Sequence, residues 1–306
     1  MLISICLIVY NQEEFIAQAI ESVLAQQVSI PYEIVIGEDH STDNTRTILD
    51  KYAQNHPDKI RLLERATNLG MHRNFAETLR ACRGDYIAVL EGDDYWVDTH
   101  KLARQAALLD ANPELSACFT RTGFHVNDDP TPQHYIPGRS GKPQYETSDL
   151  IAKNYIATCS MMFRNVVKQI DFERLQSLAM IDWPLWLLIS QFGPIGYIDD
   201  LMAAYRYHDS GVWSGRDQVR KLADQLKAYQ LMKTIMSSEY SLQFDWQIVK
   251  LQQHLATALF QVGNQRAGYQ QLFSSIRTIP LQELPTFKTY LKQAAKLLLW
   301  SVRPVS

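Results

Sequence analysis

The sequence is poor in the features that mark secreted, nucleic-acid-binding and membrane-spanning proteins. It has only four cysteines in 306 residues and no Cys-x-x-Cys pair, so we expect reduced core thiols rather than disulfides or zinc ligands. Its 30 basic and 33 acidic residues give a net charge of -3, which offers no attraction to nucleic acid. The apolar segment 1–10 is too short to cross a bilayer and lacks a basic leader, which favours a cytoplasmic location.

Apolar runs alternate with helical patterns along the first hundred residues. The runs at 2–9, 32–36, 60–63 and 86–90 lack the alternation of a half-exposed strand, which is typical of strands covered on both faces. Between them, apolar residues recur at the three- and four-residue spacing of amphipathic helices. Strand and helix units that follow one another in this way predict an α/β fold with a doubly wound, mostly parallel sheet, similar to a Rossmann fold.

The next hundred residues show less regular patterns. They predict a strand at 115–126, a long surface loop at 127–145, a strand at 158–163, a helix at 166–178, a helix that opens at Asp182, and two short strands within 195–207. A glycine at position 84 is expected to cap the helix before the fourth strand.

From Arg216 the pattern is helical. Breaks are expected at Ser237-Ser238, Gly263-Asn264 and Pro280. We therefore expect an α/β domain over residues 1–215 and an all-helical extension over 216–306 that serves assembly, packing or membrane association. Leucines and lysines mix within 290–302, which is compatible with an interfacial helix at a membrane surface, and ordinary packing is the alternative.

Three carboxylates follow the fourth apolar run within four residues. Glu91, Asp93 and Asp94 surround Gly92 at the point where that strand should end. In parallel α/β sheets this edge binds ligands, and carboxylates so close together repel one another. A divalent cation is the simplest partner, and oxygen ligands without cysteine favour Mg²⁺ or Mn²⁺. The alternative is an acidic turn that caps the helix beginning near Asp98.

Short motifs occur in a fixed order along residues 2–215. They are Ile8-Val9-Tyr10-Asn11, Glu38-Asp39-x-Ser41-x-Asp43, Asn68-x-Gly70, Gly84-Asp85-Tyr86, Glu91-Gly92-Asp93-Asp94, Asp182-Trp183 and Arg206-x-His208. In this order they resemble the inverting glycosyltransferases of family 2, which have the GT-A fold. The family usually has aspartate where this chain has Glu38 and Glu91, a change that keeps the charge and lengthens the side chain.

The resemblance implies a metal-dependent enzyme that moves a sugar from a nucleotide-diphosphate donor, such as a UDP-sugar, to a hydroxyl acceptor. The product would be a cell-surface polysaccharide or glycolipid, and the partners a nucleotide sugar and a glycan or lipid-linked acceptor. The enzyme would be cytoplasmic or peripheral at the inner face of the membrane, and could form a homo-oligomer. A cation that bridges the two phosphates would stabilise the leaving group as a Lewis acid.

The resemblance also implies site residues. The cation, Mn²⁺ or Mg²⁺, would be held by Asp93, Asp94, Glu91 and His208. The nucleotide sugar would be bound by Tyr10, Asn11, Glu13, Asp39, Arg73, Asp93, Trp183 and Trp213. Asp182 is the candidate general base, because direct displacement with inversion needs a base on the acceptor side of the sugar, and Trp183 and Trp186 could form a sugar-stacking wall beside it.

Each of these roles has a structural alternative. Asp39, Asp43 and Asp182 could cap helices, Arg73 could be a solvated helix arginine, and His208 an ordinary surface or core histidine. A sugar nucleotidyltransferase is a competing function, but it needs a glycine-rich phosphate loop with a basic residue, and segment 7–14 has neither glycine nor lysine. A non-catalytic protein that binds nucleotide sugars or glycans is the other alternative.

Overall fold

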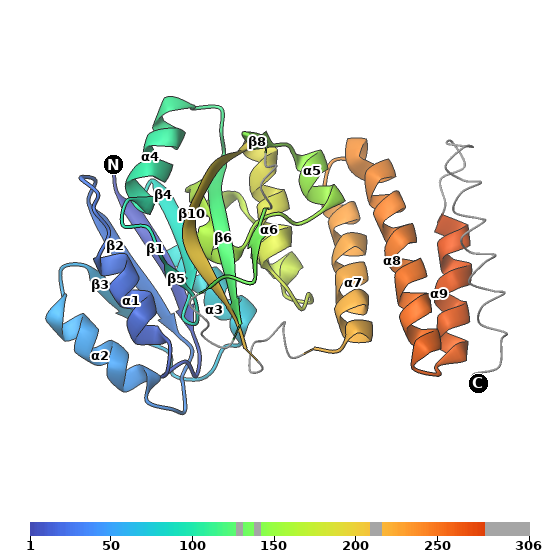
Figure 1. Cartoon of the computed structure of the whole chain (residues 1–306), viewed down its shortest axis with the longest axis horizontal. Coiled ribbons are helices and arrows are strands. Elements are labelled where there is room, and N and C mark those ends of the chain that lie inside the picture. Colours follow the sequence, from blue (N-terminus) through green and yellow to red (C-terminus); the bar gives the residue numbers. More distant parts are fainter. Residues whose placement is uncertain (127–130, 138–141, 209–215, 279–306) are drawn as a thin grey trace. The chain divides into compact units, whose positions relative to one another are not determined.

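The computed structural model describes residues 1–126, 131–137, 142–208 and 216–278. These residues form two compact units (Figure 1): one holds residues 1–177 and 181–208, and the other holds 178–180 and the described residues of the helical region. The expected division after residue 215 falls in a stretch outside the described residues, so it stays a prediction.

The first unit is built on one mixed sheet. Its strand order is β3 (Ile60–Leu63), β2 (Tyr32–Glu38), β1 (Ile3–Val9), β4 (Tyr86–Glu91), β9 (Met162–Arg164), β6 (Ala117–Val126), β10 (Ile195–Tyr207) and β5 (Tyr95–Trp96). β7 (His134–Ile136) pairs with β6, and β8 (Gln144–Tyr145) with β10. The first four strands in this order run parallel, as do β6 and β10, whereas β9 runs antiparallel between the two groups. The predicted mostly parallel α/β sheet is confirmed.

Helices cover both faces of the parallel strands (Figure 1). They are α1 (Ile16–Leu24), α2 (Thr45–Asn55), α3 (Met71–Ala81), α4 (Lys101–Ala111), α5 (Thr147–Ala152) and α6 (Asp182–Ile189). Alternate residues of β1, Ile3 to Val9, share one core cluster with the buried stripe of α1 that begins at Ile16. The alternate residue Cys6 interacts with Cys82 at the end of α3, on the other face. All of β1 is therefore buried, which explains its unbroken apolar sequence.

Several segments differ from the predictions. The expected helix at 166–178 is two short 3₁₀ turns, η2 (Val167–Gln169) and η3 (Phe172–Leu175), because Asp171 accepts a hydrogen bond from the Glu173 N–H and starts a new turn there. The expected strand at 158–163 begins as another 3₁₀ turn, η1 (Thr158–Ser160), and only then enters β9. The loop at 127–145 contains β7 and β8, which are too short to give a sequence signal.

The two short strands expected within 195–207 are one continuous strand, β10. The charged pair Asp199-Asp200 interrupts the apolar pattern, and both residues are exposed at an irregularity in the pairing with β6. A bulge lets the strand continue while these charges stay in water. A fourth short turn, η4 (Ser190–Phe192), precedes β10.

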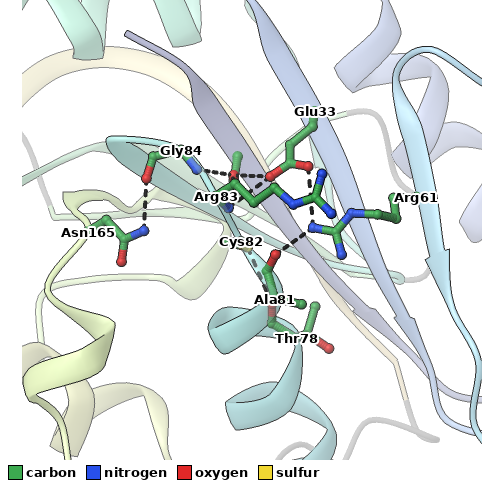
Figure 2. Close-up of polar contacts among 9 residues, drawn as sticks. Glu33, Arg61, Thr78, Ala81, Cys82, Arg83, Gly84 and Asn165 are labelled. Atoms are coloured by element: carbon green, nitrogen blue, oxygen red, sulfur yellow. Dashed lines mark hydrogen bonds and ion pairs between the residues drawn. The ribbon is translucent and has the colours of Figure 1, made fainter.

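The amino ends of the parallel strands are joined by a polar network around Glu33 of β2, shown in Figure 2. Its carboxylate accepts hydrogen bonds from the Ser4 hydroxyl at 2.7 Å and from the Arg83 N–H at 2.9 Å, and it pairs with Arg61 at 3.3 Å. Burial alone would raise the pKa of Glu33, but these partners hold that pKa below its ordinary value. The carboxylate is therefore compensated by the protein itself.

Gly84 lies in this network and does not cap α3 as expected. The helix ends at Ala81, and Cys82 is already extended. A Cβ on Gly84 would lie 2.5 Å from the backbone nitrogen of Ser4, so the close approach of β1 requires glycine here. The Gly84 N–H donates to the Ser4 hydroxyl at 2.8 Å.

The second unit contains three long helices. They are α7 (Gln218–Ile235), α8 (Ser241–Gln261) and α9 (Gln265–Thr278), with a 3₁₀ turn, η5 (Ser238–Tyr240), before α8. The breaks predicted at Ser237-Ser238 and Gly263-Asn264 are confirmed, and Gly263 has the positive φ of +79° that favours glycine after a helix. Pro280 and the candidate interfacial helix at 290–302 lie outside the described residues. None of the described helices has the length and apolar character needed to cross a membrane.

Candidate functional site

The carboxyl ends of β1, β2 and β4 meet at one edge of the sheet. β1 lies between the other two strands, with Val9 beside Glu38 and Ile8 beside Glu91. The segments that follow these strands therefore start next to one another. This brings the predicted residues Tyr10, Asp39 and Asp93 to the same end of the sheet, where α/β proteins bind ligands.

Asp39 is buried and fixed by the segment of the Asn68-x-Gly70 motif. Its carboxylate accepts a hydrogen bond from the Leu69 N–H at 2.7 Å, and its carbonyl accepts one from the Asn68 side-chain amide at 2.9 Å. It does not cap a helix, because α2 begins only at Thr45. Asp43 is the residue that acts at the start of α2, since its carboxylate accepts a hydrogen bond from the Thr45 N–H at 2.9 Å. The two motifs thus form one structural unit beside β1.

The loop after β1 joins the loop after β2. The Asn11 side-chain oxygen accepts from the Thr42 N–H at 2.8 Å, and the Glu13 carboxylate accepts from the Asn44 N–H at 2.9 Å. Asn11 has a positive φ of 52°, a strained conformation of the kind that collects at functional sites. Tyr10 is 45% exposed, so its ring is accessible at this edge. Asn11 and Glu13 hold the loops together, and Tyr10 is the residue with a free surface.

Gly92 brings the acidic turn against β1. A Cβ at this position would lie 2.6 Å from Cγ2 of Val9, and the Gly92 N–H donates to the Ile8 carbonyl at 2.9 Å. Glycine therefore lets the chain leave β4 while it stays in contact with β1. The turn then enters β5, which pairs antiparallel with β10.

Asp94 is 1% exposed and has one oxygen satisfied. Oδ1 accepts a hydrogen bond from the backbone N–H of Arg206 at 3.0 Å. Oδ2 is buried and accepts no hydrogen bond of good geometry from the described residues, and the Cys159 thiol that lies near the carboxylate is only a weak donor. A buried carboxylate oxygen in this state is costly, and functional sites are where such groups are found.

Asp93 faces the last strand and the loop after β1. Its Oδ2 lies 3.1 Å from Nε2 of His208 and 3.4 Å from the Gln12 side-chain nitrogen. His208 and Asp93 are separated by more than one hundred residues in sequence, yet the end of β10 brings them together. The structure therefore places two of the four predicted metal ligands in direct contact.

The acidic turn disfavours the ionisation of its buried carboxyl groups. Removal from water raises the pKa of Asp94, and the neighbouring Asp93 raises it further; the Arg206 N–H, the Cys159 thiol and the Arg206 charge do not offset this. Removal from water likewise raises the pKa of Glu91, and the charges of Asp94, Asp93 and Asp182 raise it further. A hydrogen bond from Thr158 lowers it by less. Both acids would ionise more readily beside a cation.

The donor set fits a hard divalent cation that is shared with a ligand. Within the described ranges, no three His, Cys, Asp or Glu side chains converge into a complete metal site. Mg²⁺ and ions like it are commonly held by one or two carboxylates while substrate phosphates supply other ligands. The unpartnered oxygen of Asp94 and the nearby carboxylate of Asp93 provide such a pair.

Asp182 is the first residue of α6 and not its N-cap, which is Ile181. Removal from water raises the pKa of Asp182, although hydrogen bonds from the N–H groups of Trp183 and Asp182 and from Asn154 act in the opposite direction. Its charge contributes to the raised pKa of Glu91, so the two carboxyl groups lie near each other. The structure thus brings Asp182 to the acidic turn from a distant part of the chain.

The two tryptophans of the predicted sugar-stacking wall are buried. Trp183 is 2% exposed and donates its indole N–H to the Leu150 carbonyl at 2.8 Å, and Trp186 is fully buried. Helix α6 is apolar on all sides, which is the pattern of a helix inside a core. Trp213 lies outside the described residues. Trp183 is therefore a core residue in this structure, and its assignment to the donor stays a prediction.

Arg73 matches the solvated alternative. Its side chain is 62% exposed on α3 and pairs with Glu77 one turn later at 2.8 Å. The sequence analysis also missed four residues that contact the acids of the site. Gln12 contacts Asp93, and Arg206 contacts Asp94. Asn154 contacts Asp182, and Thr158 contacts Glu91. Only Arg206 had a signal, since it stands in the last motif, and the others have no spacing that would identify them.

Solved structures with a similar fold contain nucleotide sugars. S. aureus TarS in complex with UDP-GlcNAc gives a TM-score of 0.68 at 16% identity and covers 98% of this chain and 89% of that one. The mannosyltransferase PcManGT from Pyrobaculum calidifontis, in complex with GDP-Man and Mn²⁺, gives 0.57 at 15% identity and covers 99% and 88%. At these identities the likeness concerns the fold, and it confirms the predicted GT-A type with helices after the sheet.

Sequence relatives match about two thirds of this chain. An uncharacterized protein of Mycobacterium tuberculosis is 37% identical over 211 residues, which are 69% of this chain and 60% of that protein. The chondroitin synthase of Escherichia coli is 36% identical over 206 residues, 65% of this chain and 28% of that protein. The chain thus spans less than two thirds of the length of either relative.

The family is settled by a match to a family model. Residues 4–171, more than half of the chain, match the model described as glycosyl transferase family 2. The matched range contains the motifs after β1, β2 and β4, which supply Tyr10, Asp39 and the acidic turn. The chain therefore belongs to glycosyl transferase family 2, as the order of its motifs predicted.

Proposed function

We propose that the chain is a cation-dependent, inverting glycosyltransferase that takes a sugar from a nucleoside diphosphate and passes it to a hydroxyl acceptor. The observation that carries this proposal is the buried oxygen of Asp94 that has no hydrogen-bond partner of good geometry, together with the raised pKa values of Asp94 and Glu91. A protein gains little stability from such an arrangement. It is useful when a ligand brings positive charge to it.

The cation would be held by Asp93 and Asp94, with Glu91 and His208 close to it. When bound with the donor, it would offset the charge that grows on the leaving diphosphate. The fold likeness to a protein with GDP-Man and Mn²⁺ supports this role, and Mn²⁺ or Mg²⁺ suits the oxygen donors. His208 contacts Asp93 directly, so it orients that carboxylate in the absence of the ion.

Asp39 and Tyr10 would receive the nucleoside. Asp39 is fixed by the Leu69 N–H, and Tyr10 has an accessible ring at the same edge. A buried carboxylate can accept hydrogen bonds from a nucleobase edge, and an exposed aromatic ring can stack on the base. UDP is the first candidate, supported by the likeness to a protein bound to UDP-GlcNAc. Asn11 and Glu13 would act indirectly, since they connect the two loops beneath it.

Asp182 would be the general base. Its carboxyl lies near Glu91, and removal from water raises its pKa, which makes its carboxylate a better base near neutral pH. It would take the proton from the acceptor hydroxyl while the oxygen attacks the anomeric carbon and the nucleoside diphosphate leaves. A single displacement of this kind inverts the anomeric configuration. Residues 1–215 would form the catalytic domain.

The acceptor is proposed to be a growing glycan or a lipid-linked sugar. One relative, the E. coli chondroitin synthase, carries the name of a polysaccharide, which supports a place in polysaccharide synthesis. The experiment that tests the function is a screen of nucleotide sugars for donor hydrolysis or transfer with Mn²⁺ and with excess chelator. We expect turnover of one donor class only with the cation, and no turnover by Asp94→Asn. Turnover that is unchanged in chelator would reject the cation-dependent proposal.

A further inference from the structure

Arg206 is the residue that most directly connects the acidic turn to its surroundings. It is the last residue but one of β10, and it is only 7% exposed. A buried guanidinium is held by hydrogen bonds and aromatic faces when it has a fixed position. The contacts of Arg206 show that it has one.

The backbone and the side chain of Arg206 hold two consecutive acids. Its N–H donates to Oδ1 of Asp94 at 3.0 Å, and Nη1 donates to the backbone carbonyl of Asp93 at 2.5 Å. Both acids are thereby tied to β10 through one residue. The side-chain contact is to the backbone of Asp93, so it leaves the Asp93 carboxylate available to other partners.

The far side of the guanidinium is anchored to the start of α1. Nη2 donates to the side-chain oxygen of Gln18, and the group lies 4.9 Å from the ring centre of Phe15 and 4.5 Å from that of Tyr95. The Phe15 ring also lies 5.1 Å from the ring of His208, which contacts Asp93. The Arg206 side chain therefore connects the acidic turn, α1 and the end of β10 through hydrogen bonds and contacts with aromatic rings.

We infer that Arg206 is a positioning residue that holds the acidic turn in the shape needed to bind the donor's cation, and that it does not itself contact the donor phosphates. Two of its nitrogens already donate to protein oxygens, and aromatic rings lie beside its plane. Lysine cannot replace it, because an ammonium group has no planar fork to reach two acceptors while it lies against two rings. The role toward the cation rests on the proposed function, whereas the clamp on the turn does not.

The clamp is tested in the cation-free protein by hydrogen exchange of the segment 93–97. The variants are Arg206→Lys, Phe15→Leu and Gln18→Ala, with Arg104→Gln as control, because Arg104 forms a surface ion pair with Asp200. Gln18 lies at an exposed position of α1, so Gln18→Ala should fold even if Arg206→Lys does not. We expect faster exchange of 93–97 in all three variants and wild-type exchange in the control.

The consequence for the ligand is tested by calorimetry with Mn²⁺ and UDP. Residues that orient metal ligands typically change metal affinity by about 10–100-fold, so we expect such a loss in Arg206→Lys and a smaller loss in Phe15→Leu and Gln18→Ala. Wild-type exchange of 93–97 in Arg206→Lys, or in both Phe15→Leu and Gln18→Ala, overturns the proposal that Arg206 holds the turn. Arg206→Lys could also lose the same UDP affinity with Mn²⁺ as with chelator, while Phe15→Leu and Gln18→Ala keep wild-type affinity. That result would show a direct contact of Arg206 with the phosphates and would overturn the proposal too. If the wild type binds no Mn²⁺ and UDP, the proposed function fails, and the exchange data still decide the clamp.

Discussion

Carboxylates at the two ends of the same sheet differ in their hydrogen-bond partners and in the direction of their pKa shifts. At the amino ends, Glu33 accepts from Ser4 and Arg83 and pairs with Arg61, and its pKa lies below the ordinary value. At the carboxyl ends, Asp94 has a buried oxygen without a partner among the described residues, and its pKa is raised. The comparison separates two uses of buried charge. A carboxylate compensated by the protein stabilises the fold, whereas one left uncompensated would, on the proposed function, be kept for a ligand.

The two ends also differ in how pH acts on stability. Glu33 has a lowered pKa, so its contribution is present above the ordinary value of 4.5 and is lost as the pH falls through its folded pKa. Asp94 has a raised pKa, so its ionisation opposes folding as the pH rises above the ordinary value of 3.8 toward its folded pKa. A bound cation would remove this second penalty.

The largest expected effect comes from Asp94→Asn. The amide keeps an oxygen that can accept from the Arg206 N–H, but it removes the charge that the cation needs. We expect transfer to fall below detection and the cation-free protein to unfold at a higher temperature than the wild type. The matched control is Asp85→Asn, since Asp85 is exposed at the amino end, where it accepts from the Leu2 N–H. Normal transfer by Asp94→Asn would contradict the account.

The next effect in size is that of Asp182→Asn. Asparagine keeps the size of the side chain and removes its basicity, so we expect transfer to fall about a hundredfold or more while donor affinity stays nearly unchanged. Asp171→Asn is the control, because Asp171 starts η3 by accepting a hydrogen bond from the Glu173 N–H. Nuclear magnetic resonance of the product should show inversion. Retention of configuration, or full activity of the variant, would mean that Asp182 is not the base.

A smaller effect is expected for Glu33→Gln at the opposite end. The variant removes the charge of a carboxylate that accepts hydrogen bonds from several partners. We therefore expect the free energy of unfolding, measured with urea, to fall by about 1–3 kcal/mol. Donor affinity should not change. Glu64→Gln provides the comparison, because that carboxylate is exposed beside Arg46 and a surface pair contributes about 0–1 kcal/mol. A change in donor affinity in Glu33→Gln would weaken the distinction between the two ends.

The smallest effect is the pH dependence of that variant. The difference in unfolding free energy between wild type and Glu33→Gln should be full at neutral pH and should shrink as the pH falls below about 4.5, because protonated Glu33 loses its advantage. Urea unfolding at a series of pH values measures this. A difference that grows as the pH falls would show that the pKa of Glu33 is not lowered.

The sequence allowed the parallel part of the fold to be predicted. Strands buried on both faces have continuous apolar runs, so β1, β2, β3 and β4 and the helices between them could be found. The antiparallel direction of β9 and the continuity of β10 could not be predicted, since β9 is only three residues long and the Asp199-Asp200 pair interrupts the apolar pattern of β10. Short strands are chosen by their neighbours in space, which a local pattern does not reveal.

The site shows a similar limit. The acidic turn and Asp39 were found because they follow apolar strands directly. The roles of Arg206 and Gln12 depend on contacts across more than eighty residues, and local spacing carries no trace of such contacts. The burial of Trp183 had a signal in the sequence, because a helix with apolar residues on every side belongs in a core.

The most direct test of the central claim is the binding of UDP, and of GDP in parallel, measured by calorimetry with Mn²⁺ and with excess chelator. Cation and nucleotide should favour each other's binding by about tenfold or more, which lies within the usual range of coupling between two ligands. We expect this difference in the wild type and in Glu33→Gln, and its loss in Asp94→Asn. Equal nucleotide affinity with Mn²⁺ and with chelator in the wild type would contradict the claim that the acidic turn is kept for a cation.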